Sequence, residues 1–87
     1  MARVEVVGCK MNGETLVSLD VRLHGLPART LDRDTVVAWM RDGHSFIPLA
    51  NGEEAPAMRL VEAQNGDEVS YFVRSDGGAD PADCISM

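Results

Sequence analysis

The clearest pattern in the chain is a strict alternation of apolar and polar residues over residues 17–24. The apolar members of this run are Val17, Leu19, Val21 and Leu23. Because successive side chains of a β-strand point to opposite faces, the alternation predicts a strand with one buried and one solvated face. Such strands are typical of an antiparallel sheet that is covered on one side only.

Two Asn-Gly pairs, Asn12-Gly13 and Asn65-Gly66, each lie between two runs rich in β-forming residues. The runs are residues 4–9 and 15–24 around the first pair and residues 58–63 and 68–74 around the second. Asn-Gly readily supplies the two positive φ angles of a type I′ turn. Both pairs therefore predict hairpins with turns of this type.

Residues 29–43 predict a helix. Asp32 is placed to cap its N-terminus, and Gly43 to take the left-handed conformation that ends many helices. The apolar stripe of this helix consists of Val36, Val37, Trp39 and Met40. A helix of about three turns is marginal alone, so we expect Val36 and Trp39 to pack on the alternating strand.

A short strand is predicted at residues 45–50, followed by a turn at residues 51–54. Pro48 in this strand has no backbone N–H, so we place the strand at an edge or a bulge of the sheet. The element order is then ββαβββ, which predicts an α+β domain with an antiparallel sheet and one helix packed on one face. A partly open small barrel and a β-grasp-like strand order are the alternatives.

The composition is that of one small globular domain: 87 residues, of which 45% are hydrophobic and 25% charged. The net charge of −6 argues against direct nucleic-acid binding, which needs a basic surface. An acidic residue stands at position 5, where a secretory signal needs apolar residues, and no apolar run reaches the roughly 18 residues of a membrane-spanning helix. We therefore expect a cytoplasmic protein that does not contact membranes.

The second half of the chain carries a series of short motifs: WMRDG at residues 39–43, YFVR at residues 71–74, and Asp83 soon after. This series resembles a family of small bacterial and phage-borne proteins known as a domain of unknown function. Members of that family carry a helix closing on Trp and Gly, a late Tyr-x-Arg-Thr segment and an Asp-Asn-Leu. Here Asp83 is followed by Cys84 and Ile85 instead. The resemblance implies a shared fold and no particular activity.

The last residues predict a loosely ordered tail, residues 76–87, which follows a domain formed by residues 1–75. Asp76, Asp80 and Asp83 are spaced by four and three residues, and no Glu follows them as in a calcium loop. We expect these three carboxylates to point into water without binding a metal, and residues 81–87 to dock weakly or not at all.

The residues that could carry zinc binding or catalysis do not have the required spacing. The soft ligands are Cys9, His24, His44 and Cys84, and they lack the paired spacing of a zinc site. Residues 42–45 place an acid, an imidazole and a hydroxyl within four residues of one another, but catalytic triads gather residues distant in sequence. A domain of this size also has little room for a pocket. We therefore predict no catalytic, cofactor-binding or metal-binding residues, no cofactor, and no enzymatic activity.

The remaining function classes involve contact with another macromolecule. We expect a small non-enzymatic soluble domain that contacts another protein, or a second copy of itself, through a sheet edge. The first alternative is a phage- or plasmid-type inhibitor that imitates the charge of a nucleic acid; its candidate surface is Asp32, Asp34, Glu53 and Glu54, which would have to form one patch. The second alternative is a small metal- or ligand-binding protein.

Overall fold

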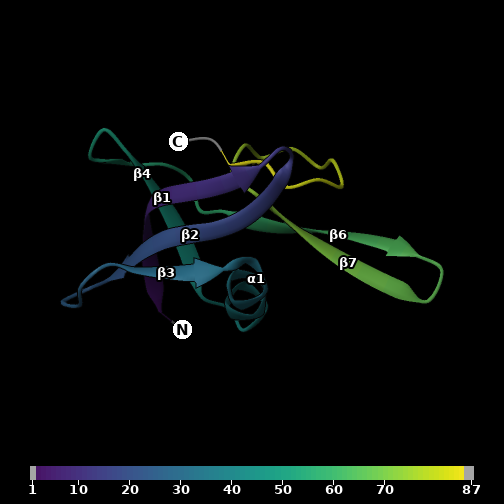
Figure 1. The fold of residues 1–87 in the computed structure, drawn as a ribbon, viewed down its shortest axis with the longest axis horizontal. Helices are drawn as coiled ribbons and strands as arrows, with labels where there is room; N and C mark the ends of the chain where they lie inside the picture. The colour runs from purple at the N-terminus through teal and green to yellow at the C-terminus, as the bar shows by residue number, and fades with distance from the viewer. Residues whose placement is uncertain (1, 86–87) are drawn as a thin grey trace.

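The computed structural model describes residues 2–85, which fold into an α+β domain with one helix (Figure 1). The elements in chain order are β1 (Arg3–Asn12), β2 (Thr15–Leu23), β3 (Arg29–Asp32), α1 (Arg33–Arg41), β4 (Ser45–Ala50), β5 (Glu53–Glu54), β6 (Arg59–Asn65) and β7 (Glu68–Arg74). One sheet has the strand order β3-β2-β1-β4-β5, and β6 and β7 form a separate hairpin. The predicted α+β class is confirmed, and the sheet does not close into a barrel.

The five-stranded sheet is mixed, whereas an antiparallel sheet was predicted. β1 pairs antiparallel with β2 but parallel with β4, with Arg3 opposite Ser45 and Val6 opposite Pro48. Parallel neighbours need a long crossover connection, and here the connection includes α1. β4 is second from the sheet edge because the two-residue β5 lies outside it. Since β5 pairs only with Leu49 and Ala50, the missing N–H of Pro48 removes no bond to β5.

Both predicted hairpins form, but their turns lie one residue later than expected. In the β1–β2 hairpin, Asn12 pairs with Thr15, so Gly13 and Glu14 make the turn. Of these residues only Gly13 has a positive φ, 63°, which is the φ pattern of a type II′ turn. The β6–β7 turn is similar, with Gly66 at a φ of 69°. The predicted type I′ turns are therefore wrong at both positions.

The type I′ pattern occurs instead at the third Asn-Gly pair, which connects β4 to β5. Asn51 has a φ of 54° and Gly52 a φ of 79°. Ala50 and Glu53 pair on either side of them, so the two residues form the whole turn. Asn51 is the non-glycine residue with a positive φ in the described chain, and asparagine tolerates this conformation better than most residues.

The caps of helix α1 are those predicted, but residues 29–31, which the predicted helical segment included, pair with β2 as part of strand β3. The Asp32 carboxylate accepts a hydrogen bond of 2.8 Å from the Thr35 N–H, which caps the N-terminus. Hydrogen bonds from the side chain and the backbone of Thr35 lower the pKa of Asp32. At the other end Gly43 has a φ of 96°. The N–H groups of Gly43 and His44 donate to the carbonyls of Met40 and Trp39, which is the bonding pattern of a Schellman motif.

In residues 2–85 no helix is long and apolar enough to cross a membrane.

Strand β2 buries a partly different set of residues from the one predicted by its alternation. Leu19 and Val21 are fully buried as expected, but Leu16 is buried in place of Val17, which is 38% exposed. The register passes over Val17, because Leu16 and Ser18 pair with consecutive residues of β1. Such a bulge shifts the inward and outward phase of a strand by one residue. Val17 is therefore not part of the surface on which the helix packs.

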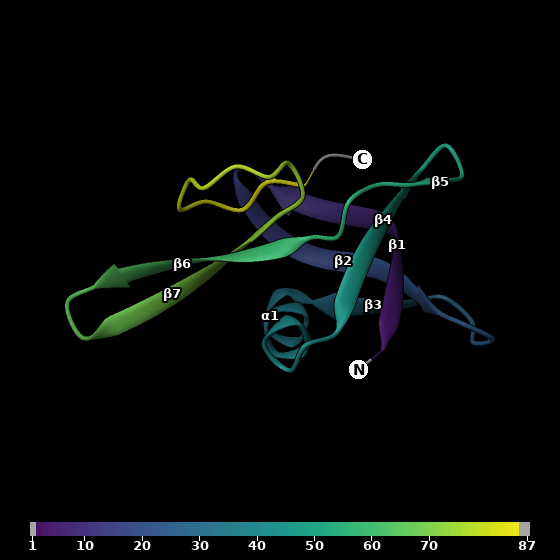
Figure 2. The same ribbon diagram turned by 180° about the vertical axis from the view of Figure 1, so that it is seen from behind.

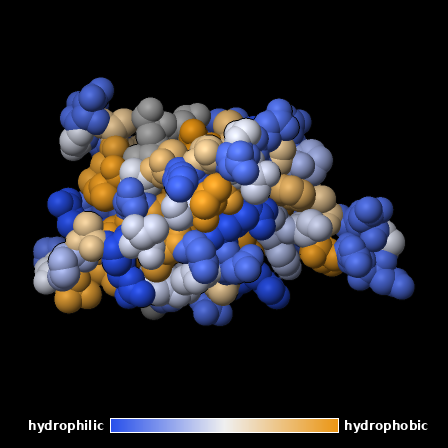
Figure 3. All heavy atoms as spheres, viewed as in Figure 1, coloured by the Kyte–Doolittle hydropathy of each residue, from blue (hydrophilic) through white to orange (hydrophobic). Residues whose placement is uncertain are grey.

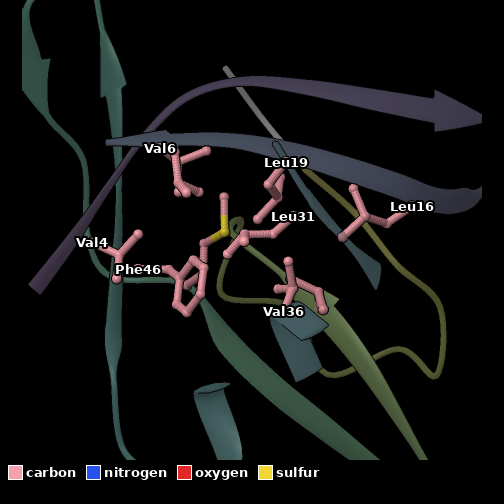
Figure 4. Close-up of a cluster of buried hydrophobic side chains, with 10 residues drawn as sticks. Val4, Val6, Leu16, Leu19, Leu31, Val36 and Phe46 are labelled. Carbon is pink, nitrogen blue, oxygen red and sulfur yellow. The ribbon is translucent and has the colours of Figure 1, made fainter. Parts of the chain in front are cut away.

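The core lies between the sheet and a second layer formed by α1 and the base of the β6–β7 hairpin. Its labelled side chains point toward one another from β1, β2, β3, β4 and α1 (Figure 4), and Val73 of β7 and Met58 of the segment before β6 also belong to it. Its buried members are Val4, Val6, Leu16, Leu19, Val21, Leu31, Val36, Phe46, Met58 and Val73. Phe46 is the largest of the fully buried side chains, and Trp39, which is half-buried, packs against it with ring centroids 6.3 Å apart. The predicted docking of the helix is confirmed.

The β6–β7 hairpin projects from the body of the domain in both ribbon views (Figures 1 and 2). The domain measures 42 × 23 × 21 Å, and the hairpin extends along the longest direction. From Gln64 to Ser70 every residue is exposed, and the surface at the projecting end is mostly hydrophilic (Figure 3). Only the base of the hairpin contributes to the core.

Candidate interaction surface

Asp83 is the side chain that ties the projecting hairpin to the rest of the domain. One carboxylate oxygen accepts hydrogen bonds from the Leu16 N–H at 2.9 Å and from Arg33 Nε at 2.8 Å. The other accepts from the Val73 N–H at 2.8 Å and from Arg33 Nη2 at 3.2 Å. Asp83 therefore connects β2, α1 and β7, and it is only 6% exposed. The prediction that Asp83 points into water is wrong.

The hydrogen bonds of Asp83 also keep it ionised. Burial raises the pKa of Asp83, but the hydrogen bonds from Arg33, Leu16 and Val73 outweigh burial and lower the pKa below its ordinary value. The same pair raises the pKa of Arg33. A carboxylate offers about four lone-pair sites, and all four are used here. Asp83 is therefore a structural residue and not an available acid or base.

The segment after Asp83 lies along the outer edge of β7. The Cys84 N–H donates to the Val73 carbonyl at 2.9 Å, and the Ser75 N–H donates to the Cys84 carbonyl at 2.9 Å.

Asp76, which is exposed as predicted, accepts a 2.7 Å hydrogen bond from the Arg74 guanidinium. This contact, together with the Gly78 N–H, holds the pKa of Asp76 well below its usual range. Residues 86 and 87 of the predicted tail lie outside the described residues.

Two arginines of α1 attach the helix to β7. Arg33 donates to the Tyr71 carbonyl at 2.7 Å, and its guanidinium lies 5.8 Å from the ring centre of Phe72. Arg41 lies over the Tyr71 ring at 4.8 Å. Between helix and strand is an open groove of about 400 Å³, lined in part by Arg33, Tyr71 and Phe72. Asp34 and Ser70 also line this groove, and the Arg33 guanidinium beside them is already bound to Asp83 and to the Tyr71 carbonyl.

The four carboxylates of the predicted acidic surface lie at two separate places. Asp32 caps α1 and Asp34 lies in its first turn, next to the β3 edge of the sheet. Glu53 and Glu54 form β5, at the opposite edge, and Glu54 pairs with Arg3. Four inter-strand spacings of about 4.8 Å separate the two edges, or about 19 Å. The structure does not bring these four residues into one patch.

The candidate metal ligands are also dispersed. Among residues 2–85, no three His, Cys, Asp or Glu side chains are grouped closely enough to hold a metal ion. Cys9 and Cys84 are half-buried and are not joined by a disulfide. His44 accepts a hydrogen bond of 2.9 Å from the Ala2 N–H, which ties the start of the chain to the end of the helix.

The outer edge of β7 is already occupied over part of its length. In an antiparallel ladder, opposite residues either bond to each other or both direct their backbone groups away. Val73 directs its N–H to Asp83 and its carbonyl to Cys84, and Tyr71 directs its carbonyl to Arg33. Val73 and Tyr71 are therefore outward-facing residues of β7, and the domain itself covers them.

The opposite edge of the hairpin, on β6, is open. Leu60 pairs with Val73 and Glu62 pairs with Tyr71, so both β6 residues also direct their backbone groups outward. Gln64, two residues further, does the same. We call the outward N–H and carbonyl groups of Leu60, Glu62 and Gln64 the β6 edge. In the part of the chain that the structure describes, no strand pairs with it.

Sequence reasoning did not find the β6 edge or the role of Asp83. The signal for the edge was the alternation in β6 and β7 together with their turn, but it did not show that the hairpin stays apart from the sheet.

Models of known protein families, curated proteins and solved structures were all compared with this chain, and none matches it. The family resemblance drawn from the motifs therefore stays a prediction.

Proposed function

We propose that this protein is a non-enzymatic domain that binds another protein, and that the β6 edge is the docking line. An exposed strand edge presents unpaired N–H and carbonyl groups, and these can pair with an extended segment of a partner. The observation that carries the proposal is the projecting two-stranded hairpin whose β6 edge has no strand beside it.

The β6 edge suits this role better than the other edges. β6 has seven residues, whereas the edge strands of the main sheet, β3 and β5, have four and two. The β7 edge is covered at Val73 by the C-terminal segment and at Tyr71 by Arg33. A partner strand would therefore find its longest run of unpaired backbone on β6. Acidic mimicry and metal binding have no comparable support.

The proposal can be tested with random peptides displayed on phage and selected against the immobilised protein. Selected peptides should shift the backbone amide NMR signals of Leu60, Glu62 and Gln64 more than those of the β3 edge. The matched variant is Gln64→Pro, which removes one outward N–H. Gln64 and Val69 face each other without hydrogen bonds, so this change leaves the ladder of the hairpin intact.

The Gln64→Pro protein should keep its fold and lose binding of the selected peptides. A second variant, Thr30→Pro, places the same substitution on the β3 edge strand and serves as the control. Peptides that bind both variants as well as the unmodified protein would contradict docking at the β6 edge. The same holds if no peptide is enriched over background.

A further inference from the structure

The side chains of β6 differ on its two faces, and this difference determines what a partner strand would meet. Glu62 and Gln64 are exposed on one face, while Val61 and Ala63 are half-buried on the other. Val61 lies directly opposite Phe72 of β7, which is also half-buried. Side chains directly opposite each other on paired strands are about 4.5–5.5 Å apart at Cβ. The residues on each face of β6 would therefore contact the partner residues that lie on the same face.

The charge of the hairpin is of one sign. Residues 60–73 contain Glu62, Asp67 and Glu68 but no Lys, Arg or His. The ion pairs of the described residues are Arg3–Glu54, Arg22–Glu5, Arg33–Asp83 and Arg74–Asp76, and none of them involves these three carboxylates. The two arginines at the base of the hairpin are also engaged, Arg59 with the Gly77 carbonyl and Arg74 with Asp76. A basic partner would therefore meet three carboxylates that take part in none of these ion pairs, with Arg41 of α1 the cation that lies over Tyr71, the residue paired with Glu62.

We propose that the β6 edge takes an extended segment of another protein in which basic and apolar residues alternate. This inference rests on the function proposed above and specifies its partner. A basic side chain opposite Glu62 would pair with it, and the flanking apolar side chains would lie beside Val61 and Ala63 and extend the apolar surface that these residues form with Phe72. The hydrogen bonds would come from the β6 edge itself.

A second copy of this chain fits the same edge poorly. Each copy has a net charge of −6, so two copies repel each other at low salt. In an antiparallel β6–β6 pair centred on Glu62, two glutamates would face each other directly, and like charges in that position are destabilising. The acidic hairpin therefore favours a basic partner over self-association.

The probe for this inference is the synthetic peptide acetyl-Lys-Val-Lys-Val-Lys-Val-Lys-amide, titrated into the labelled protein at low salt. Its counterpart replaces every Lys with Glu. We expect saturable amide shifts centred on residues 60–64 with the lysine peptide and at least tenfold weaker binding of the glutamate peptide. Low salt matters because an exposed ion pair weakens as the screening length falls to about 10 Å at 0.1 M.

Backbone methylation separates strand pairing from plain charge attraction. In an antiparallel pair the lysine opposite Glu62 directs its N–H toward β6, while the valines direct theirs away. Methylating the backbone nitrogens of the lysines should therefore abolish binding, and methylating those of the valines should leave it nearly unchanged. The opposite result would indicate a parallel pair. With the first lysine left unmethylated, each peptide carries three methyl groups, so the two peptides are isomers of equal charge.

Two charge reversals on the protein provide a matched control. Glu62→Lys should weaken binding of the lysine peptide about five- to tenfold, as expected for losing an exposed ion pair and gaining a repulsion. Glu53→Lys changes the net charge equally but lies in β5; with both variants compared at 0.1 M salt, where the screening length is about 10 Å, its effect should stay below about twofold because the charge is distant. The Glu62→Lys protein should in turn bind the glutamate peptide better than the unmodified protein does.

The possible outcomes distinguish this inference from the function on which it rests. If lysine and glutamate peptides bind the β6 edge equally well, and methylation still discriminates, then docking at the edge holds and the basic partner is wrong. If the two methylated isomers bind equally well, or if the shifts spread over acidic residues throughout the domain, then edge docking is wrong as well.

Discussion

The five-stranded sheet and the β6–β7 hairpin are built from similar strands and similar turns, yet they differ sharply in burial. In the sheet, Val4, Leu19 and Phe46 have no exposed surface. In the hairpin only Val73 is a buried apolar residue, while Val69 in the same strand is 43% exposed. The difference arises because α1 and the hairpin base cover one face of the sheet, whereas nothing in residues 2–85 covers the distal half of the hairpin.

This comparison shows that strand pairing alone does not give a rigid element. A two-stranded hairpin is marginally stable in water and needs packing against something else. Here the support is concentrated at the base, where Val73 enters the core and Asp83 joins β7 to β2 and α1. We therefore expect the distal hairpin to open locally at a lower free energy than the sheet. Such low-stability elements are suited to binding.

The largest effect is expected from removing the residue that joins the two regions. Asp83→Ala should lower the free energy of unfolding by about 3–5 kcal/mol, because it leaves the Leu16 and Val73 N–H groups and the Arg33 guanidinium without their acceptor. Urea denaturation measures the change. Asp80→Ala, an exposed change in the same segment, is the control and should cost less than about 0.5 kcal/mol. Equal stabilities of the two variants would contradict the role given to Asp83.

A smaller effect is expected from weakening the contact on the helix side. Arg33→Lys keeps the charge but cannot reproduce both bonds to Asp83 and the bond to the Tyr71 carbonyl. We expect a loss of about 1–2 kcal/mol. Amide hydrogen exchange should show the hairpin losing protection before the sheet does. Uniform loss of protection across both regions would show that they do not separate in this way.

The sequence was sufficient to predict features that depend on residues close to one another in the chain. The caps of α1 depend on Asp32 and Gly43, which lie next to the helix that they end, and both were predicted. The turn position was missed because Asn-Gly permits two placements of the turn, and the strand register decides between them. The phase of β2 was missed because a bulge at Val17 follows from pairing with β1 and leaves no mark in the alternation itself.

Non-local features could not be predicted in the same way. Asp83 lies in a stretch without apolar alternation, and its partners Leu16 and Arg33 are 67 and 50 residues away in sequence. The short strand β3 contributes one buried residue, Leu31, which is too little for a pattern. The β6 edge could be recognised only once the structure showed that the hairpin does not join the main sheet.

The connection between the regions should also weaken in acid. The folded-state pKa of Asp83 is lowered, so its contribution is fully present above the pKa of an unfolded aspartate, about 3.9, and is lost as the pH falls through the folded-state pKa. Asp76 and Asp32 have lowered pKa values too and act in the same direction. Urea denaturation below pH 4 should therefore show stability falling with pH. Asp83→Asn should reduce this pH dependence without removing it, and an unchanged slope would contradict the assignment.

The smallest effect is expected at the far end of the hairpin, where the comparison can be made within one strand. Val69 and Val73 both belong to β7 and both face the same side, but Val69 is 43% exposed and Val73 is fully buried. Val73→Ala should cost about 2 kcal/mol, through lost burial and the cavity left behind, whereas Val69→Ala should stay within about 0.5 kcal/mol. Thermal or urea unfolding of the two variants measures the difference. A Val69→Ala variant as unstable as Val73→Ala would mean that the distal hairpin is packed against the domain, and that the β6 edge is less accessible than the docking proposal requires.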